Sequence, residues 1–100
     1  ALNVIHRSLF EGATRIGRNA KLDTKIHIGH NCVVGENVVI TPGVVLCGSS
    51  TLGDGVWLGP NSSVLNKVTV GKNTMIGMGS VVTREIPTGS LAYGVPAKVK

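Results

Sequence analysis

The sequence predicts an all-β protein wound as a parallel β-helix, a solenoid in which short strands alternate with turns. Three observations support this fold class. Apolar residues recur at every sixth position from Val4 to Val82, a small or β-branched residue follows four positions after each of them, and glycine often comes directly after the apolar residue. An α-helix has apolar residues about every 3.6 positions and a simple strand has them at every second position, so neither element explains the spacing.

The composition indicates a folded chain with an interior of small side chains. Hydrophobic residues make up 42% and charged residues 15% of the sequence, which is typical of a globular protein. Only three aromatic residues accompany 14 glycines, so large rings cannot fill the core. No apolar run approaches the ~18 residues of a membrane span, and the N-terminus lacks the apolar core of a secretory signal. We expect a cytoplasmic protein that does not insert into a membrane.

The repeat is expected to run through the chain without insertion. The predicted inward apolar residues, in chain order, are Val4, Phe10, Ile16, Leu22, Ile28, Val34, Ile40, Leu46, Leu52, Leu58, Val64, Val70, Ile76 and Val82. Each six-residue unit supplies one strand and one turn, and three units close a triangular coil, so residues eighteen apart stack. This predicts a triangular prism of four to five coils over residues 1–87 and a C-terminal tail over residues 88–100. The glycine after the apolar residue is expected to provide backbone freedom beside a corner.

One predicted outward column has unusually large apolar side chains. It consists of Lys21, Val39, Trp57 and Met75. Three large apolar groups stacked on an outer face would form an exposed patch, which is typical of a contact surface. Scattered surface apolar residues are the alternative.

A second outward column has the groups that acyl transfer requires. His30 stands at a predicted corner, two residues after the inward Ile28, and its column continues through Gly48, Asn66 and Arg84. An imidazole can accept the proton of an attacking amine or hydroxyl. The backbone N–H of Gly48 could stabilise the oxyanion of a thioester carbonyl, and Arg84 at the far end suits the phosphates of coenzyme A.

The segment HIGHNCVVGENVVITPGVVLCGS, residues 27–49, resembles the hexapeptide-repeat acyltransferase family, in particular bacterial sugar N-/O-acetyltransferases and lipid A-type N-acyltransferases. The resemblance implies a left-handed β-helix. It also implies that His30 is the general base and that the amide of Gly48 faces the thioester. The ending GVPAK, residues 94–98, resembles the closing motif of acetyl-CoA-dependent sugar acetyltransferases, which adds Lys98 to Asn66 and Arg84 as candidate coenzyme A contacts.

The resemblance further implies a homotrimer with active sites between subunits, and the apolar column is the candidate interface. Acetyl-CoA would be the co-substrate, and an amino sugar or nucleotide-sugar the acceptor. The length of the transferred acyl group stays open, since it could be acetyl or longer. Its carrier also stays open, since it could be coenzyme A or a carrier protein. The group that orients the His30 ring also stays open: Asn31, Glu11 and a residue of an adjacent subunit are all candidates.

Three other functions are alternatives to acyl transfer. The β-helix could be a non-catalytic trimerising module. A γ-carbonic-anhydrase-like metalloenzyme needs three histidines, with two of them four residues apart, and the spacing of His27 and His30, with His6 elsewhere, does not match. We therefore expect no metal. The net charge of +5 could attract nucleic acid, but no aromatic residues are interleaved with the basic ones, so no nucleic-acid partner is expected.

Overall fold

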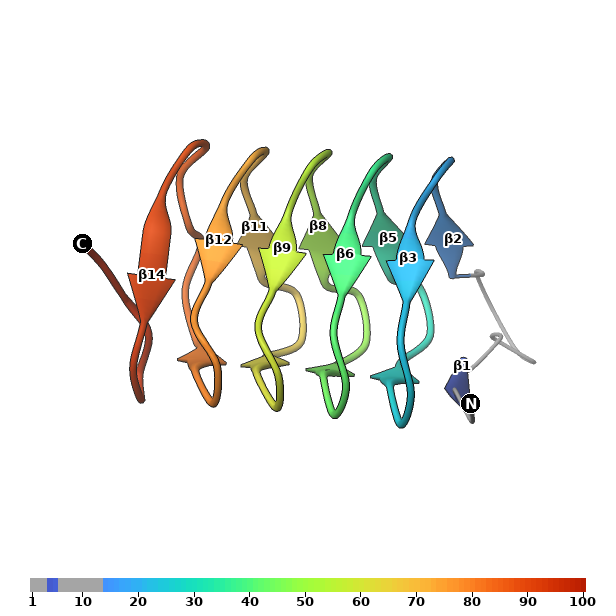
Figure 1. Ribbon diagram of the computed structural model, residues 1–100, viewed down its shortest axis with the longest axis horizontal. Coiled ribbons are helices and arrows are strands. Elements are labelled where there is room, and N and C mark those ends of the chain that lie inside the picture. The colour runs from blue at the N-terminus through green and yellow to red at the C-terminus, as the bar shows by residue number, and fades with distance from the viewer. Residues whose placement is uncertain (1–3, 6–13) are drawn as a thin grey trace.

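The computed structural model describes residues 4–5 and 14–100, and it shows the left-handed parallel β-helix that the sequence predicts (Figure 1). Its strands are β1 (Val4–Ile5), β2 (Arg15–Ile16), β3 (Lys21–Leu22), β4 (His27–Ile28), β5 (Val33–Val34), β6 (Val39–Ile40), β7 (Val45–Leu46), β8 (Thr51–Leu52), β9 (Trp57–Leu58), β10 (Ser63–Val64), β11 (Thr69–Val70), β12 (Met75–Ile76), β13 (Val81–Val82), β14 (Leu91–Tyr93) and β15 (Lys98–Val99). They form three sheets, which are the three faces of the prism.

The first sheet has the order β1-β4-β7-β10-β13, the second β2-β5-β8-β11 and the third β3-β6-β9-β12-β14-β15. Every strand from β2 to β10 pairs in parallel with the strand eighteen residues further on, as in Arg15 with Val33 and Lys21 with Val39. The four strands of the second sheet mark four successive coils. The structure thus confirms the predicted stacking rule. Residues 4–5 and 14–100 contain no helix that could span a membrane.

The predicted register is wrong at the first unit. Val4 pairs with His27, and Ile5 with Ile28, whereas an unbroken repeat would pair Val4 with Leu22. The pairing is displaced by five residues from the predicted one, which puts β1 on the first sheet instead of the third. Because Val4 and Ile5 are both apolar, the six-residue pattern alone does not decide which of them continues the repeat. Phe10, another predicted inward residue, lies outside the described residues. The regular stacking is observed from Arg15 onward.

The core is a column of interlocking aliphatic side chains inside the prism. The inward residues of successive strands, such as Ile28, Leu46 and Val64, have no exposed surface. Their burial removes apolar area from water and is the main stabilising term. The small inward position between strands also accepts hydroxyl groups, because a backbone carbonyl is within reach: Ser62 donates to the Gly59 carbonyl at 2.8 Å. Cys32 packs at such a position, and its thiol is free, as is that of Cys47.

The glycine after the inward residue has a different role from the predicted one. A Cβ on Gly17 would stand 2.6 Å from the Gly35 carbonyl carbon, and one on Gly29 would stand 2.8 Å from the Gly48 nitrogen. Neither glycine has a positive φ. Glycine is therefore needed here because successive coils approach closely, and the expectation of backbone freedom at this position was wrong.

The left-handed backbone conformation falls two residues later in each turn. Positive φ angles occur at every sixth residue, namely Asn19, Lys25, Asn31, Asn37, Gly43, Ser49, Gly55, Asn61, Lys67, Asn73 and Gly79. Asparagine is common there because its short polar side chain tolerates this region better than other side chains do. Each turn therefore has a first corner residue with ordinary φ and a second corner residue with positive φ.

We name two of the three edges of the prism for reference. The His30 corner follows the first sheet and comprises residues 29–31, 47–49, 65–67 and 83–85. The proline corner follows the third sheet and comprises residues 23–25, 41–43, 59–61 and 77–79. Except at residues 83–85, where Glu85 has no positive φ, both corners have the same turn and differ in the side chains that they carry.

Residues 88–100 contain β14 and β15. β14 pairs in parallel with β12 and buries Ala92, while β15 returns antiparallel to β14. The chain between these strands lies against β13, since the Val81 N–H donates to the Gly94 carbonyl and the Ala97 N–H donates to the Val81 carbonyl. The C-terminal segment thus lies beside the last residues of the His30 corner. The division of the chain at residue 87 remains a prediction.

Candidate active site

The His30 side chain is exposed and points toward the next coil. Its carbonyl accepts the Ser49 N–H at 2.9 Å, which fixes its main chain to the coil above. A Cβ on Gly48 would stand 3.2 Å from His30 Nε2 and 3.4 Å from Cε1. The ring therefore lies directly against Gly48, in space that exists because residue 48 has no side chain.

The N–H of Gly48 is not used by the fold. Among residues 14–100, no group accepts a hydrogen bond from it. The same turn position is proline at Pro42 and Pro60, so the β-helix does not need an N–H there. Below it, the absence of a Cβ on Gly29 leaves the Gly48 nitrogen uncovered. The corner thus brings an imidazole and a free backbone donor together.

Asn31 contacts the other side of the ring. Its Nδ2 lies 3.3 Å from His30 Nδ1, and its φ of 59° places it at the second corner position. An asparagine amide can present either its oxygen or its nitrogen to the ring. With the oxygen accepting Nδ1–H, the lone pair of Nε2 stays free beside Gly48. Glu11, another candidate for orienting the ring, lies outside the described residues.

The predicted coenzyme A contacts lie further along the same corner. The register of β10 with β13 puts Asn66 and Arg84 in successive coils above Gly48. Arg84 and Lys98 line one cavity of about 370 Å³, together with Thr83, Pro96 and Ala97. The structure therefore brings the two predicted cations together. The sequence reasoning missed Thr83, although its place just before Arg84 at the end of β13 could have indicated it.

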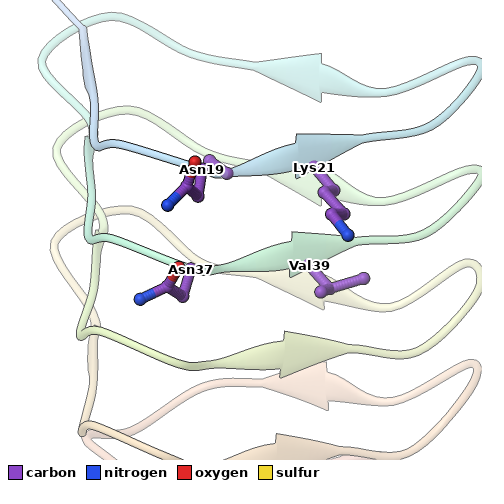
Figure 2. Close-up of a pocket in the computed structure, with 5 residues that line it drawn as sticks. Asn19, Lys21, Asn37 and Val39 are labelled. Atoms are coloured by element: carbon purple, nitrogen blue, oxygen red, sulfur yellow. The ribbon is translucent and has the colours of Figure 1, made fainter.

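The predicted apolar column is also present on the outer face of the third sheet. Lys21, Val39, Trp57 and Met75 are paired in register, and Leu91 extends the column. Met75 is 50% exposed and Leu91 43% exposed. Near the start of this face, a shallow cavity of about 570 Å³ lies over β3 and β6, lined by Asn19, Ala20, Lys21, Asn37 and Val39 (Figure 2).

The histidines do not assemble a metal centre in the part of the chain described by the structure. His27 faces outward from β4 and pairs with Val45, while His6 lies outside the described residues. Within residues 14–100, no three His, Cys, Asp or Glu side chains are close enough to hold a metal ion. The His30 corner is the candidate active site.

A left-handed prism of six-residue units defines the class of hexapeptide-repeat proteins. Within that class, the family described as bacterial transferase hexapeptide (six repeats) matches residues 13–48 and 49–84. The chain belongs to this family.

Individual relatives show the same likeness. UDP-3-O-acylglucosamine N-acyltransferase of Maricaulis maris is 52% identical over 94 residues, which are 94% of this chain and 27% of that protein. Soybean serine acetyltransferase superposes with a TM-score of 0.83 at 32% identity over 87% of this chain and 40% of that one. A serine acetyltransferase in complex with CoA gives a TM-score of 0.82 at 31% identity, covering 87% and 39% of the two chains. The chain spans about a quarter of the length of the curated relatives that it matches.

Proposed function

We propose that this chain forms the catalytic β-helix of an acyltransferase that moves an acetyl or other acyl group from coenzyme A to the amine or hydroxyl of a sugar or nucleotide-sugar. The observation that carries the proposal is the contact between the His30 ring and Gly48, whose N–H has no acceptor among the described residues. A general base and an oxyanion donor are the two groups that acyl transfer from a thioester needs.

In the proposed reaction, the acceptor nitrogen or oxygen attacks the thioester carbonyl carbon. His30 Nε2 takes the proton of the acceptor as the new bond forms, and the carbonyl oxygen becomes an oxyanion facing the Gly48 N–H. Collapse of this intermediate breaks the carbon–sulfur bond. The thiolate of coenzyme A leaves and takes the proton from His30, which restores the neutral imidazole.

The cavity at the far end of the His30 corner supports coenzyme A as the acyl donor. Arg84 and Lys98 line it, and guanidinium and ammonium groups form charge-assisted hydrogen bonds with phosphate. A pantetheine arm is extended, so it could follow the corner from this cavity past Asn66 to Gly48. The relative solved with CoA is consistent with this choice of donor.

The apolar column on the third sheet supports a homotrimer. Val39, Trp57, Met75 and Leu91 are stacked on one outer face, two of them substantially exposed, and such a patch is typical of a protein contact. The His30 corner is the edge between the first and second sheets, so the acceptor site would lie between subunits if the third sheet of one prism packed against the His30 corner of its neighbour.

Calorimetric titration with acetyl-CoA, with the oligomeric state measured by light scattering in the same buffer, tests the proposal. We expect saturable binding at one site per subunit of a trimer, followed by acetyl transfer to a member of a panel of amino sugars and nucleotide-sugars. A well-folded trimer that does not bind acetyl-CoA would instead support the non-catalytic module.

A further inference from the structure

Lys67 is linked directly to the residue that faces the proposed reaction centre. It is the second corner residue of the His30 corner, one coil above Ser49 and two above Asn31. Its N–H donates to the Gly48 carbonyl at 3.1 Å. This hydrogen bond fixes the main chain of Lys67 relative to Gly48. Lys67 is not itself a member of the column that contains His30 and Gly48, because it stands at the second corner position.

Lysine is an unfavourable residue at this turn position. Lys67 has a φ of 64°, in the left-handed region that is unfavourable for a residue with a Cβ. Asparagine and glycine occupy eight of the equivalent positions, and lysine only Lys25 and Lys67. An unfavourable residue in a strained conformation is more common at functional sites than elsewhere.

Side chains at this position point back toward the preceding coil. A Cβ on Gly43 would collide with the Asn61 amide oxygen, and one on Gly55 would collide with the Asn73 amide oxygen. Asn61 and Asn73 therefore extend over the second corner residue one coil below. Figure 2 shows Asn19 and Asn37 at the same place in two successive coils. The residue below Lys67 is Ser49, which has a Cβ, so the longer Lys67 side chain would run beside Ser49 to reach the coil that contains Gly48.

The His30 ring approaches Gly48 from the opposite side, because it extends toward the following coil. No carboxylate within residues 14–100 forms an ion pair with Lys67, and the acidic residue of the next coil in this corner, Glu85, stands on the side away from Gly48. Among the described residues, no carboxylate therefore neutralises the ammonium group of Lys67.

We propose that Lys67 is a further catalytic residue, whose ammonium group stabilises the oxyanion together with the Gly48 N–H. This inference rests on the proposed acyl transfer. A cation placed where negative charge develops is more effective than a neutral donor, since its hydrogen bond to the oxyanion is charge-assisted. Lys67 would stay protonated and would not transfer a proton in the reaction, and His30 remains the base.

The matched pair Lys67→Asn and Lys25→Asn tests the inference. Both changes install the residue that this turn position favours, so both variants should keep or raise the unfolding temperature. We expect Lys67→Asn to lower kcat for acetyl transfer by about tenfold or more with little change in the KM for acetyl-CoA, and Lys25→Asn, in the proline corner, to leave kcat unchanged. Lys67→Arg, which restores the cation, should recover part of the lost rate.

The outcomes separate this inference from the proposed function. An active wild-type chain whose kcat is the same in Lys67→Asn overturns the role of Lys67 alone. An equal loss in Lys67→Asn and Lys67→Arg also overturns it, because the charge would then not matter. A wild-type chain that neither transfers the acetyl group nor hydrolyses acetyl-CoA refutes the proposed function, and the role of Lys67 with it.

Discussion

The His30 corner and the proline corner have the same backbone and opposite chemistry. Both place a left-handed residue second in each turn, such as Asn31 in one and Asn61 in the other. At the first position, the proline corner has Pro42 and Pro60, which have no N–H, whereas the His30 corner has Gly48, whose N–H is open. The comparison teaches that, in these two corners, the coils are joined through the carbonyl of the first corner residue and not through its N–H, so that donor is free for function.

The largest expected effect comes from removing the base. His30→Ala should lower acetyl transfer by about 10² or more, because the His30 ring supplies the side-chain atoms nearest to a Cβ built on Gly48. Trimer formation and coenzyme A binding should not change. Steady-state kinetics, light scattering and calorimetry measure the three quantities. Met78→Ala changes the same turn position in the proline corner and should keep full activity; an active His30→Ala variant would rule out His30 as the base.

Giving the His30 corner the proline of the proline corner tests whether the Gly48 N–H takes part in the reaction. Gly48→Pro copies Pro42 and Pro60, so the fold should tolerate it, while the loss of the N–H should lower kcat by about 10²–10³ relative to Gly48→Ala, which adds only the Cβ beside the His30 ring. The reverse change, Pro60→Gly, should not affect kcat. Thermal unfolding checks that both variants are folded. If Gly48→Pro were folded and fully active, the amide would have no part in the reaction.

The glycines next to the strands should be equally important in both corners. A Cβ on Gly29 would stand 2.8 Å from the Gly48 nitrogen, and one on Gly59 would stand 2.7 Å from the Met78 nitrogen. Both Gly→Ala variants should lose about 3 kcal/mol of unfolding free energy in urea denaturation. Gly79→Ala, where a Cβ meets no atom within 4 Å but φ is 67°, should lose about 1 kcal/mol. A larger loss at Gly79 than at Gly59 would contradict this explanation.

The smallest effect is expected at the far end of the His30 corner. Arg84→Ala should weaken coenzyme A binding about threefold to tenfold, because a single exposed contact to phosphate contributes little in water. The difference from wild type should shrink at high salt. Calorimetry at two salt concentrations measures both effects. Lys72→Ala, an exposed cation at a turn outside the His30 corner, is the control, and a loss of affinity there as large as at Arg84 would indicate nonspecific attraction.

The six-residue period predicted the prism, the inward residues from Ile28 to Val82 and the pairing of residues eighteen apart. These follow from one local rule repeated along the chain, since each coil must place its apolar residue over that of its neighbour. The same rule placed Gly48 and Asn66 above His30. It failed at Val4, which pairs with a residue five positions beyond the predicted one, because apolar residues stand at both positions 4 and 5 and the pattern alone does not choose between them.

The sequence by itself determined which residues face inward and which stack at each corner, because side-chain direction and coil length are set locally. Only the tertiary structure decided what those residues can reach. The His30 ring against Gly48, the Asn31 amide beside Nδ1, and Arg84 next to Lys98 depend on rotamers and on the path of the C-terminal segment. The tertiary structure also showed that the strand-end glycines are required for space, since the clash involves backbone atoms of a different coil.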